Sequence, residues 1–174
     1  MRNSALWMLA FLPLLGCASG ASSVAMTVGP GPSDVPTSAR HKGSIGVEDV
    51  SGGDETNPMW KSNVSNTEFR GALEGSLKNQ EYLASPAGAA KYRVKAELVS
   101  VDQPTFGLDM TVKATVNYVI SQAQNAQKIS KRLVASATAT MSDAFVGVTR
   151  LRIATERAMQ ANIKEFLKEI PSLP

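Results

Sequence analysis

Alternation of hydrophobic and polar residues, broken only at Val119, Lys131 and Val134, marks two long stretches in the second half of the chain. The first covers 108–120 and the second covers 129–141, and the polar run 121–127 separates them. A period of two is typical of strands that bury one face, so the pattern predicts two long, half-buried β-strands joined by a turn. Leu108 begins the first strand on its buried face, and Met141 ends the second strand in the same way.

Two further strands are predicted earlier in the chain. Residues 91–101 alternate until the apolar positions shift by one residue, and this shift predicts a β-bulge near Leu98 and Val99. A short strand is expected over 43–50. The run 51–58 that follows, Ser-Gly-Gly-Asp-Glu-Thr-Asn-Pro, has the composition of a loop.

Helical spacing of apolar residues predicts two amphipathic helices. Ser65 and Glu68 have the spacing of a capping box at the start of the first helix, with Asn66 as a competing cap. The second helix is expected over 148–170 and ends at Pro171, because proline cannot continue a helix. The stripe that the first helix would bury consists of Phe69, Ala72, Leu73, Ser76 and Leu77.

These elements follow one another in the order β-α-β-β-β-α. Three consecutive strands favour an antiparallel meander, and a sheet with one apolar face needs helices to cover that face. The sequence therefore predicts one globular α+β domain over 42–174, a two-layer sandwich with a largely antiparallel sheet and two helices on one face. Its composition, 43% hydrophobic and 19% charged, is that of an ordinary globular domain.

The first sixteen residues have the pattern of an export signal. Arg2 lies in a short polar start, and the apolar core over 5–15 is too short to span a bilayer as a helix. The motif at 14–17, Leu-Leu-Gly-Cys, resembles the lipobox of bacterial lipoproteins. That resemblance implies cleavage after residue 16 and acylation of Cys17, which would become the lipid-bearing first residue.

Cys17 is the single cysteine of the chain, so an internal disulfide is excluded. The alternative to lipidation is a buried free thiol, but small and polar residues follow Cys17 directly. The next residue is Ala18 rather than the Asp that retains many lipoproteins at the inner membrane. We therefore expect an outer-membrane lipoprotein that faces the periplasm, with the inner membrane as the alternative.

Residues 17–41 are predicted to form a flexible tether between the lipid and the domain. The run 28–38 holds three prolines and two glycines and has no apolar period, so it offers little surface to bury. The chain's single histidine, His41, ends this tether and is expected to be solvated.

The charge of the chain argues against nucleic acid as a partner. The formal net charge is +3, and aromatic residues make up 6% of the chain. Nucleic-acid binding requires Lys and Arg gathered on one face, usually with aromatic residues between them. We expect the partner to be the membrane, reached through the lipid on Cys17, together with another envelope protein or lipid.

The sequence offers few candidates for catalysis. A catalytic base must be fixed in position by packing, and a histidine in a flexible tether is not. The chain also has no metal-binding or phosphate-binding motif. Asp102, Asp109 and Asp143 stand near predicted strand ends, where carboxylates usually cap backbone amides. We therefore predict no catalytic residue, no cofactor and no metal site.

Loop aromatics and helix arginines are the remaining binding candidates. Trp60 and Phe106 lie in predicted loops, where an aromatic residue either anchors a partner or folds back over the edge of the core. Arg150, Arg152 and Arg157 open the last helix. They would hold an anionic headgroup or form salt bridges along the helix surface.

Four motif runs, within 51–60, 69–77, 102–112 and 142–152, resemble a group of poorly characterised proteobacterial envelope lipoproteins. The resemblance extends over about 43–170. Some members of that group are labelled UDP-N-acetylglucosamine acyltransferase. The group has no established catalytic residues, so the resemblance implies none here.

Three functions follow as expectations. The first is a non-enzymatic binding or scaffolding lipoprotein of the envelope, with Trp60 and Phe106 as contact residues. The second is an accessory protein that handles lipid or glycan, which would require an apolar cavity between sheet and helices. The third is an enzyme of the acyltransferase type.

Overall fold

A computed structural model describes the protein at residues 20–30, 35, 38–53, 63–86, 89–124 and 127–174. In chain order its elements are α1 (Ser23–Met26), η1 (Ala39–His41), β1 (Ile45–Ser51), α2 (Asn66–Asn79), β2 (Tyr92–Asp102), β3 (Met110–Gln122), β4 (Lys128–Ala139), α3 (Gly147–Glu169) and η3 (Ile170–Ser172).

The four strands form one sheet in the order β1-β2-β3-β4. β1 pairs with β2 in parallel, with α2 as the connection between them, whereas β2, β3 and β4 form an antiparallel meander. The predicted bulge is confirmed, because the register of β2 against β3 shifts between Leu98 and Ser100. The predicted α+β sandwich with a largely antiparallel sheet is therefore the observed fold.

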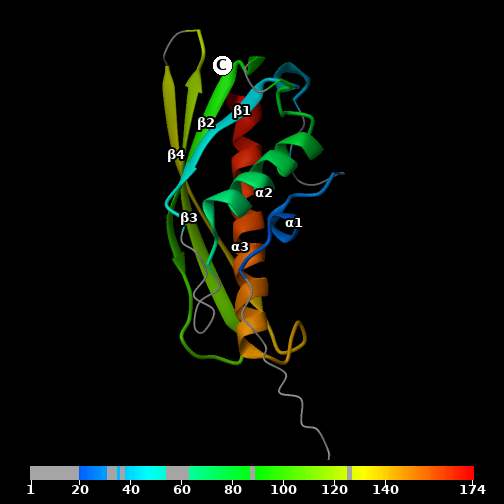
Figure 1. Ribbon diagram of the computed structural model, residues 1–174, viewed down its shortest axis with the longest axis vertical. Coiled ribbons are helices and arrows are strands. Elements are labelled where there is room, and N and C mark those ends of the chain that lie inside the picture. Colours follow the sequence, from blue (N-terminus) through cyan, green and yellow to red (C-terminus); the bar gives the residue numbers. More distant parts are fainter. Residues whose placement is uncertain (1–19, 31–34, 36–37, 54–62, 87–88, 125–126) are drawn as a thin grey trace, which may run out of the picture.

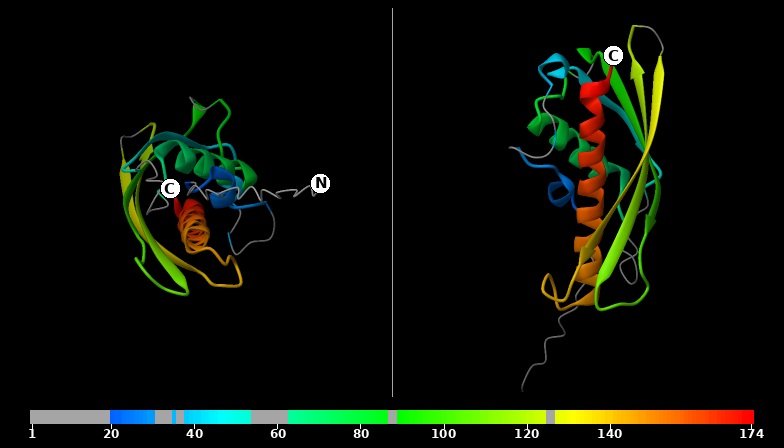
Figure 2. Two further views of the ribbon diagram at one scale, coloured as in Figure 1. Left: turned by 60° about the horizontal axis from the view of Figure 1, so that its bottom comes forward. Right: turned by 180° about the vertical axis from the view of Figure 1, so that it is seen from behind.

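The helices cover one face of this sheet, as Figures 1 and 2 show. α2 packs against β1, and α3 runs along β3 and β4. Ser65 caps α2 by accepting a hydrogen bond from the Glu68 amide at 3.2 Å, as the sequence predicted. At the centre of the core, Tyr118 and Phe166 stack with their ring centroids 4.2 Å apart.

One polar side chain of α3 is completely buried against the sheet. The Tyr118 hydroxyl donates to Asn162 Oδ1 at 3.0 Å, and the Asn162 amide nitrogen donates to the carbonyls of Ala114 and Leu133 at 3.2 and 2.9 Å. Burial raises the pKa of Tyr118 above its usual range, so the phenol stays a hydrogen-bond donor. The network fixes the position of α3 over β3 and β4 because each of its polar groups has a partner.

The prediction of a flexible tether is wrong for residues 20–30 and 38–41. Met26 is fully buried, Val28 is nearly so, and His41 is only 1% exposed. We call residues 20–30 the N-terminal segment; its short helix α1 packs against both α2 and α3. The apolar residues of this segment are too few to show a period, so its composition predicted a flexible tether where the structure has a packed segment.

Side chains of α2 and α3 satisfy the backbone of the N-terminal segment. Ser76 Oγ accepts from the Val28 amide at 2.9 Å, and Asn79 Nδ2 donates to the Val28 carbonyl at 2.9 Å. Gln160 Nε2 donates to the Thr27 carbonyl at 2.8 Å. The carboxylate of Glu68 accepts from the backbone of Ser23, so only the Ser65 half of the predicted capping box forms.

Two glycines of α2 allow this close approach. A Cβ atom at Gly71 would lie 3.1 Å from Ser23 Cβ, and one at Gly75 would lie 3.2 Å from Thr27 Oγ1. Glycine inside a helix costs about 1 kcal/mol relative to alanine. The two glycines therefore indicate a packing requirement, and the N-terminal segment is what they accommodate.

Candidate contact surface at one end of the domain

Two loops meet at the end of the domain where α3 begins. The loop 103–109 joins β2 to β3, and the loop 140–146 joins β4 to α3. Figure 1 and the right-hand view of Figure 2 place both loops at the same end, opposite the β3–β4 turn. The pairing of Met110 with Ala139 explains this, because the start of β3 and the end of β4 lie side by side.

Large apolar side chains of these loops point into solvent. Phe106 is 88% exposed, Phe145 is 84% exposed and Leu108 is 73% exposed. Together with three less exposed neighbours they form what we call the apolar tip: Phe106, Leu108, Met141, Phe145, Val146 and Val148. Isolated exposed apolar residues are common in proteins, but these six are gathered on two neighbouring loops and, for Val148, on the first turn of α3. Such a group indicates an interaction site.

Internal hydrogen bonds hold the 140–146 loop in its shape. The guanidinium of Arg150, which is buried, donates to the carbonyls of Ala144 and Phe145 at 2.9 and 2.7 Å. Asp143 accepts from the Thr140 amide at 2.8 Å and forms an ion pair with Arg157 at 2.6 Å. These contacts present Phe145 on a fixed turn, which lowers the entropy cost of binding.

The 103–109 loop has one position that requires glycine. Gly107 has a φ of +152°, and a Cβ atom there would lie 2.8 Å from the Asp109 carbonyl oxygen. Glycine accepts this conformation without strain. The turn that it allows leaves both Phe106 and Leu108 exposed.

The charges of this end are few. Residues 103–109 and 140–148 include no Lys or Arg, and their acidic residues are Asp109 and Asp143. Hydrogen bonds from Arg157 and from the Thr140 backbone lower the pKa of Asp143 to about 2. Asp143 therefore stays ionised at neutral pH, and its charge is paired with Arg157 at the surface.

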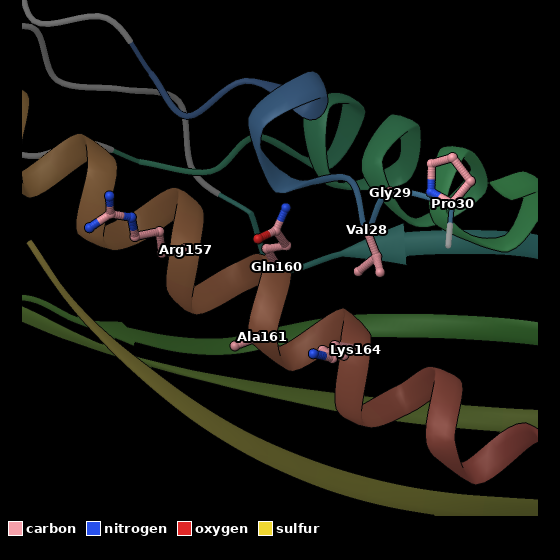
Figure 3. A pocket seen from close by; sticks show the side chains of 7 residues that line it. All are labelled: Val28, Gly29, Pro30, Arg157, Gln160, Ala161 and Lys164. Atoms are coloured by element: carbon pink, nitrogen blue, oxygen red, sulfur yellow. The ribbon is translucent and has the colours of Figure 1, made fainter. Parts of the chain in front are cut away.

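A separate groove of about 340 Å³ lies between the N-terminal segment and α3 (Figure 3). Its lining residues are Val28, Gly29, Pro30, Arg157, Gln160, Ala161 and Lys164. The polar groups of Arg157 and Gln160 already bind Asp143 and the Thr27 carbonyl. The groove is thus a seam along which the segment is attached, and it does not have the lining of an apolar lipid cavity.

The structure also brings a serine to the only histidine. Ser38 Oγ lies 3.0 Å from His41 Nδ1, across one turn of η1. Burial, with a smaller contribution from Arg40, lowers the pKa of His41, and the Leu173 backbone opposes this in part. Among the described residues, no carboxylate pairs with the ring to orient it, as a catalytic triad would require. The expectation that His41 is solvated is wrong.

The predicted contact residues have different outcomes. Phe106 is exposed at the apolar tip and does not fold back over the core. Trp60 and the lipidation site Cys17 lie outside the described residues. Leu108 and Met141 were assigned to buried strand positions, but β3 begins at Met110 and β4 ends at Ala139, so both residues belong to the loops.

The other predicted polar residues serve the fold. Asp102 pairs with Lys113 across the strands at 3.3 Å, and Asp143 caps the Thr140 amide. Arg157 forms the expected salt bridge, whereas Arg150 is buried and holds loop carbonyls. Within the described ranges, no three potential ligands gather for a metal, and no helix is long and apolar enough to cross a membrane.

Phe145 and Val146 were missed by the sequence reasoning. A signal was present, because two large apolar residues interrupt a stretch of small and polar residues between a predicted strand and a predicted helix. A buried helix face could include Phe145 and Val146 only if the helix began before Gly147, where α3 starts.

Comparison with protein-family models and with curated proteins found no match. Solved structures do resemble the chain. A protein from Xanthomonas campestris assigned to the DUF330 family superposes with a TM-score of 0.59 at 9% identity, covering 88% of this chain and 94% of that one. A hypothetical protein from Chlamydia trachomatis gives 0.54 at 11% identity, with 75% and 96% covered.

A proposed lipoprotein from Caulobacter crescentus gives a TM-score of 0.51 at 13% identity, with 76% of this chain and 91% of that chain covered. At these identities the likeness concerns the fold alone. The sandwich seen here is therefore an architecture that bacterial proteins of very different sequence share.

Proposed function

We propose that the protein is a lipid-anchored envelope lipoprotein, held at the periplasmic face of the outer membrane through Cys17. We propose further that its folded domain acts by non-enzymatic binding through the apolar tip. The export signal and the Leu-Leu-Gly-Cys motif at 14–17 support the anchor. The similarity in fold to a proposed lipoprotein is consistent with this assignment.

The observation that carries the binding role is the exposure of Phe106, Leu108 and Phe145 on two loops at one end. Aromatic side chains are enriched at interaction sites, and a few such anchors usually supply most of the binding energy. Internal hydrogen bonds from Arg150 keep one of these loops in a fixed shape. The most specific feature of this end is therefore a preformed apolar surface.

A deletion strain complemented with variants tests this function. We expect the double variant Phe106→Ser and Phe145→Ser to lose complementation of an envelope-stress phenotype, such as growth in detergent. Val134→Ser is the matched control, because Val134 is also an exposed apolar residue but lies on β4, away from the tip. Each variant is first checked for normal abundance and folding.

The enzymatic alternative is tested in the same strain. General acid–base catalysis contributes about 10²–10⁴-fold in rate, so an enzyme would lose most activity with its essential group. The candidate polar substitutions are His41→Ala, Asp102→Asn, Asp109→Asn and Asp143→Asn. If one of these abolishes function in a stable protein while the tip variant remains active, catalysis replaces binding as the function.

A further inference from the structure

The position at which the described chain begins places the anchor near the apolar tip. The Ser22 amide donates to Glu156 Oε1 at 3.0 Å, which fixes this part of the N-terminal segment against α3. Glu156 lies nine residues after Gly147, so it stands about 14 Å along the helix from the start of α3. In Figure 1 the first described residues, drawn in blue, lie on the side of α1 that faces the loops.

The distance that remains to Cys17 is short. Ala21 is four residue steps after Cys17, and extended chain spans about 3.6 Å per step, so the lipid-bearing residue lies within about 14 Å of Ala21. This maximum span from Ala21 to Cys17 equals the distance along the α3 axis between the level of Ser22 and the start of α3. The lipid on Cys17 and the side chains of the apolar tip therefore have access to the same plane.

This geometry favours insertion of the tip. With the anchor so close, contact of the tip with the bilayer is an intramolecular event at high effective concentration, so modest apolar contacts suffice. Residues 103–109 and 140–148 include no Lys or Arg, and the nearby Arg150 is buried and holds loop carbonyls, so the tip itself offers little attraction to headgroups. The contact would depend on apolar burial, which salt does not screen.

We infer that the apolar tip inserts into the lipid surface of the bilayer that holds the Cys17 anchor. This inference rests on the proposed function and names the occupant of the same surface. Phe106, Leu108 and Phe145 enter the acyl boundary, and the sheet stands upright on the membrane. Because β3 has thirteen residues, the β3–β4 turn then lies about 40 Å above the tip.

The experiment uses the full lipidated protein reconstituted into vesicles of phosphatidylethanolamine and phosphatidylglycerol. The variants Phe106→Cys and Phe145→Cys each introduce one free thiol, because Cys17 carries lipid, and the thiol is labelled with an environment-sensitive fluorophore. Gln124→Cys, in the exposed β3–β4 turn, is the control. Lipids with a spin label on the acyl chain serve as quenchers.

We expect both tip probes to shift to shorter emission wavelength and to be quenched several-fold more than the probe at residue 124, equally at low and high salt. Two tip positions keep the test valid if one variant fails to fold. Tip probes that stay in water, with quenching equal to that at residue 124, would overturn the inference. If tip substitutions nevertheless abolish function in cells, the binding role stands and the occupant is a protein.

Discussion

Substitution of Met26 tests whether the N-terminal segment belongs to the folded domain. Met26 is fully buried in α1, a helix that packs against α2 and α3, whereas Val24 of the same helix is 85% exposed. Met26→Ala removes apolar atoms from a closed site and leaves a cavity. Val24→Ala removes atoms that already face water, so it is a matched control.

The expected magnitude follows from this burial. Met→Ala substitutions at buried positions cost about 2 to 5 kcal/mol, the spread reflecting how far the surroundings collapse. The backbone of the segment is held by several hydrogen bonds to α2 and α3, which limits collapse. We therefore expect about 3 kcal/mol for Met26→Ala, and less than about 0.5 kcal/mol for Val24→Ala.

Urea unfolding of residues 18–174, followed by circular dichroism, measures the difference. With a slope of about 2 kcal/mol per molar urea, Met26→Ala should lower the midpoint by about 1.5 M. A fragment that starts at residue 42 should be destabilised by more, because it lacks the whole N-terminal segment. Equal midpoints for Met26→Ala and Val24→Ala would show that residues 20–30 are not part of the cooperative unit.

Three further predictions concern buried or paired polar groups. Asn162→Ala should destabilise the protein by about 3 kcal/mol, because it removes the partner of the buried Tyr118 hydroxyl and two bonds to strand carbonyls. Tyr118→Phe should cost less in the same urea assay. The lowered pKa of His41 means that the unfolded chain binds the proton more tightly than the folded protein does. The neutral, buried His41 is therefore compatible with full stability above about pH 6.5, and stability declines as pH falls below that value. His41→Gln should flatten this dependence of stability on pH between about pH 7.5 and 5.5. Asp143, with a pKa of about 2 against an ordinary 3.8, stabilises the fold above pH 3.8 and loses this effect toward pH 2, so Asp143→Asn should be less sensitive to acid in that window.

Periodicity predicted the sheet and the two long helices because each of these elements buries one face. The bulge in β2 was visible as a shift in the alternation at Leu98, and the cap of α2 was visible at Ser65. Strand ends were less predictable. Leu108 and Met141 continue the alternation, but the ladder stops at the pair Met110 and Ala139.

The N-terminal segment could not be predicted from periodicity, because its packing depends on partners far away in the sequence. Its backbone is satisfied by Ser76, Asn79 and Gln160, and its close approach depends on glycines of α2. The apolar tip was half predicted, through Phe106. Its other aromatic, Phe145, became significant only when the fold brought two loops to one end.

The most direct test of the account is the chemical accessibility of the apolar tip in intact envelopes. Phe106→Cys and Val134→Cys each add one thiol to a protein whose only cysteine, Cys17, is the proposed lipidation site, and both positions are exposed in the isolated chain. A water-soluble maleimide is applied before and after detergent solubilisation. We predict that residue 106 reacts slowly in envelopes and rapidly in detergent, while residue 134 reacts rapidly in both. Equal and rapid labelling of both positions in intact envelopes would contradict the claim that the tip is a contact surface.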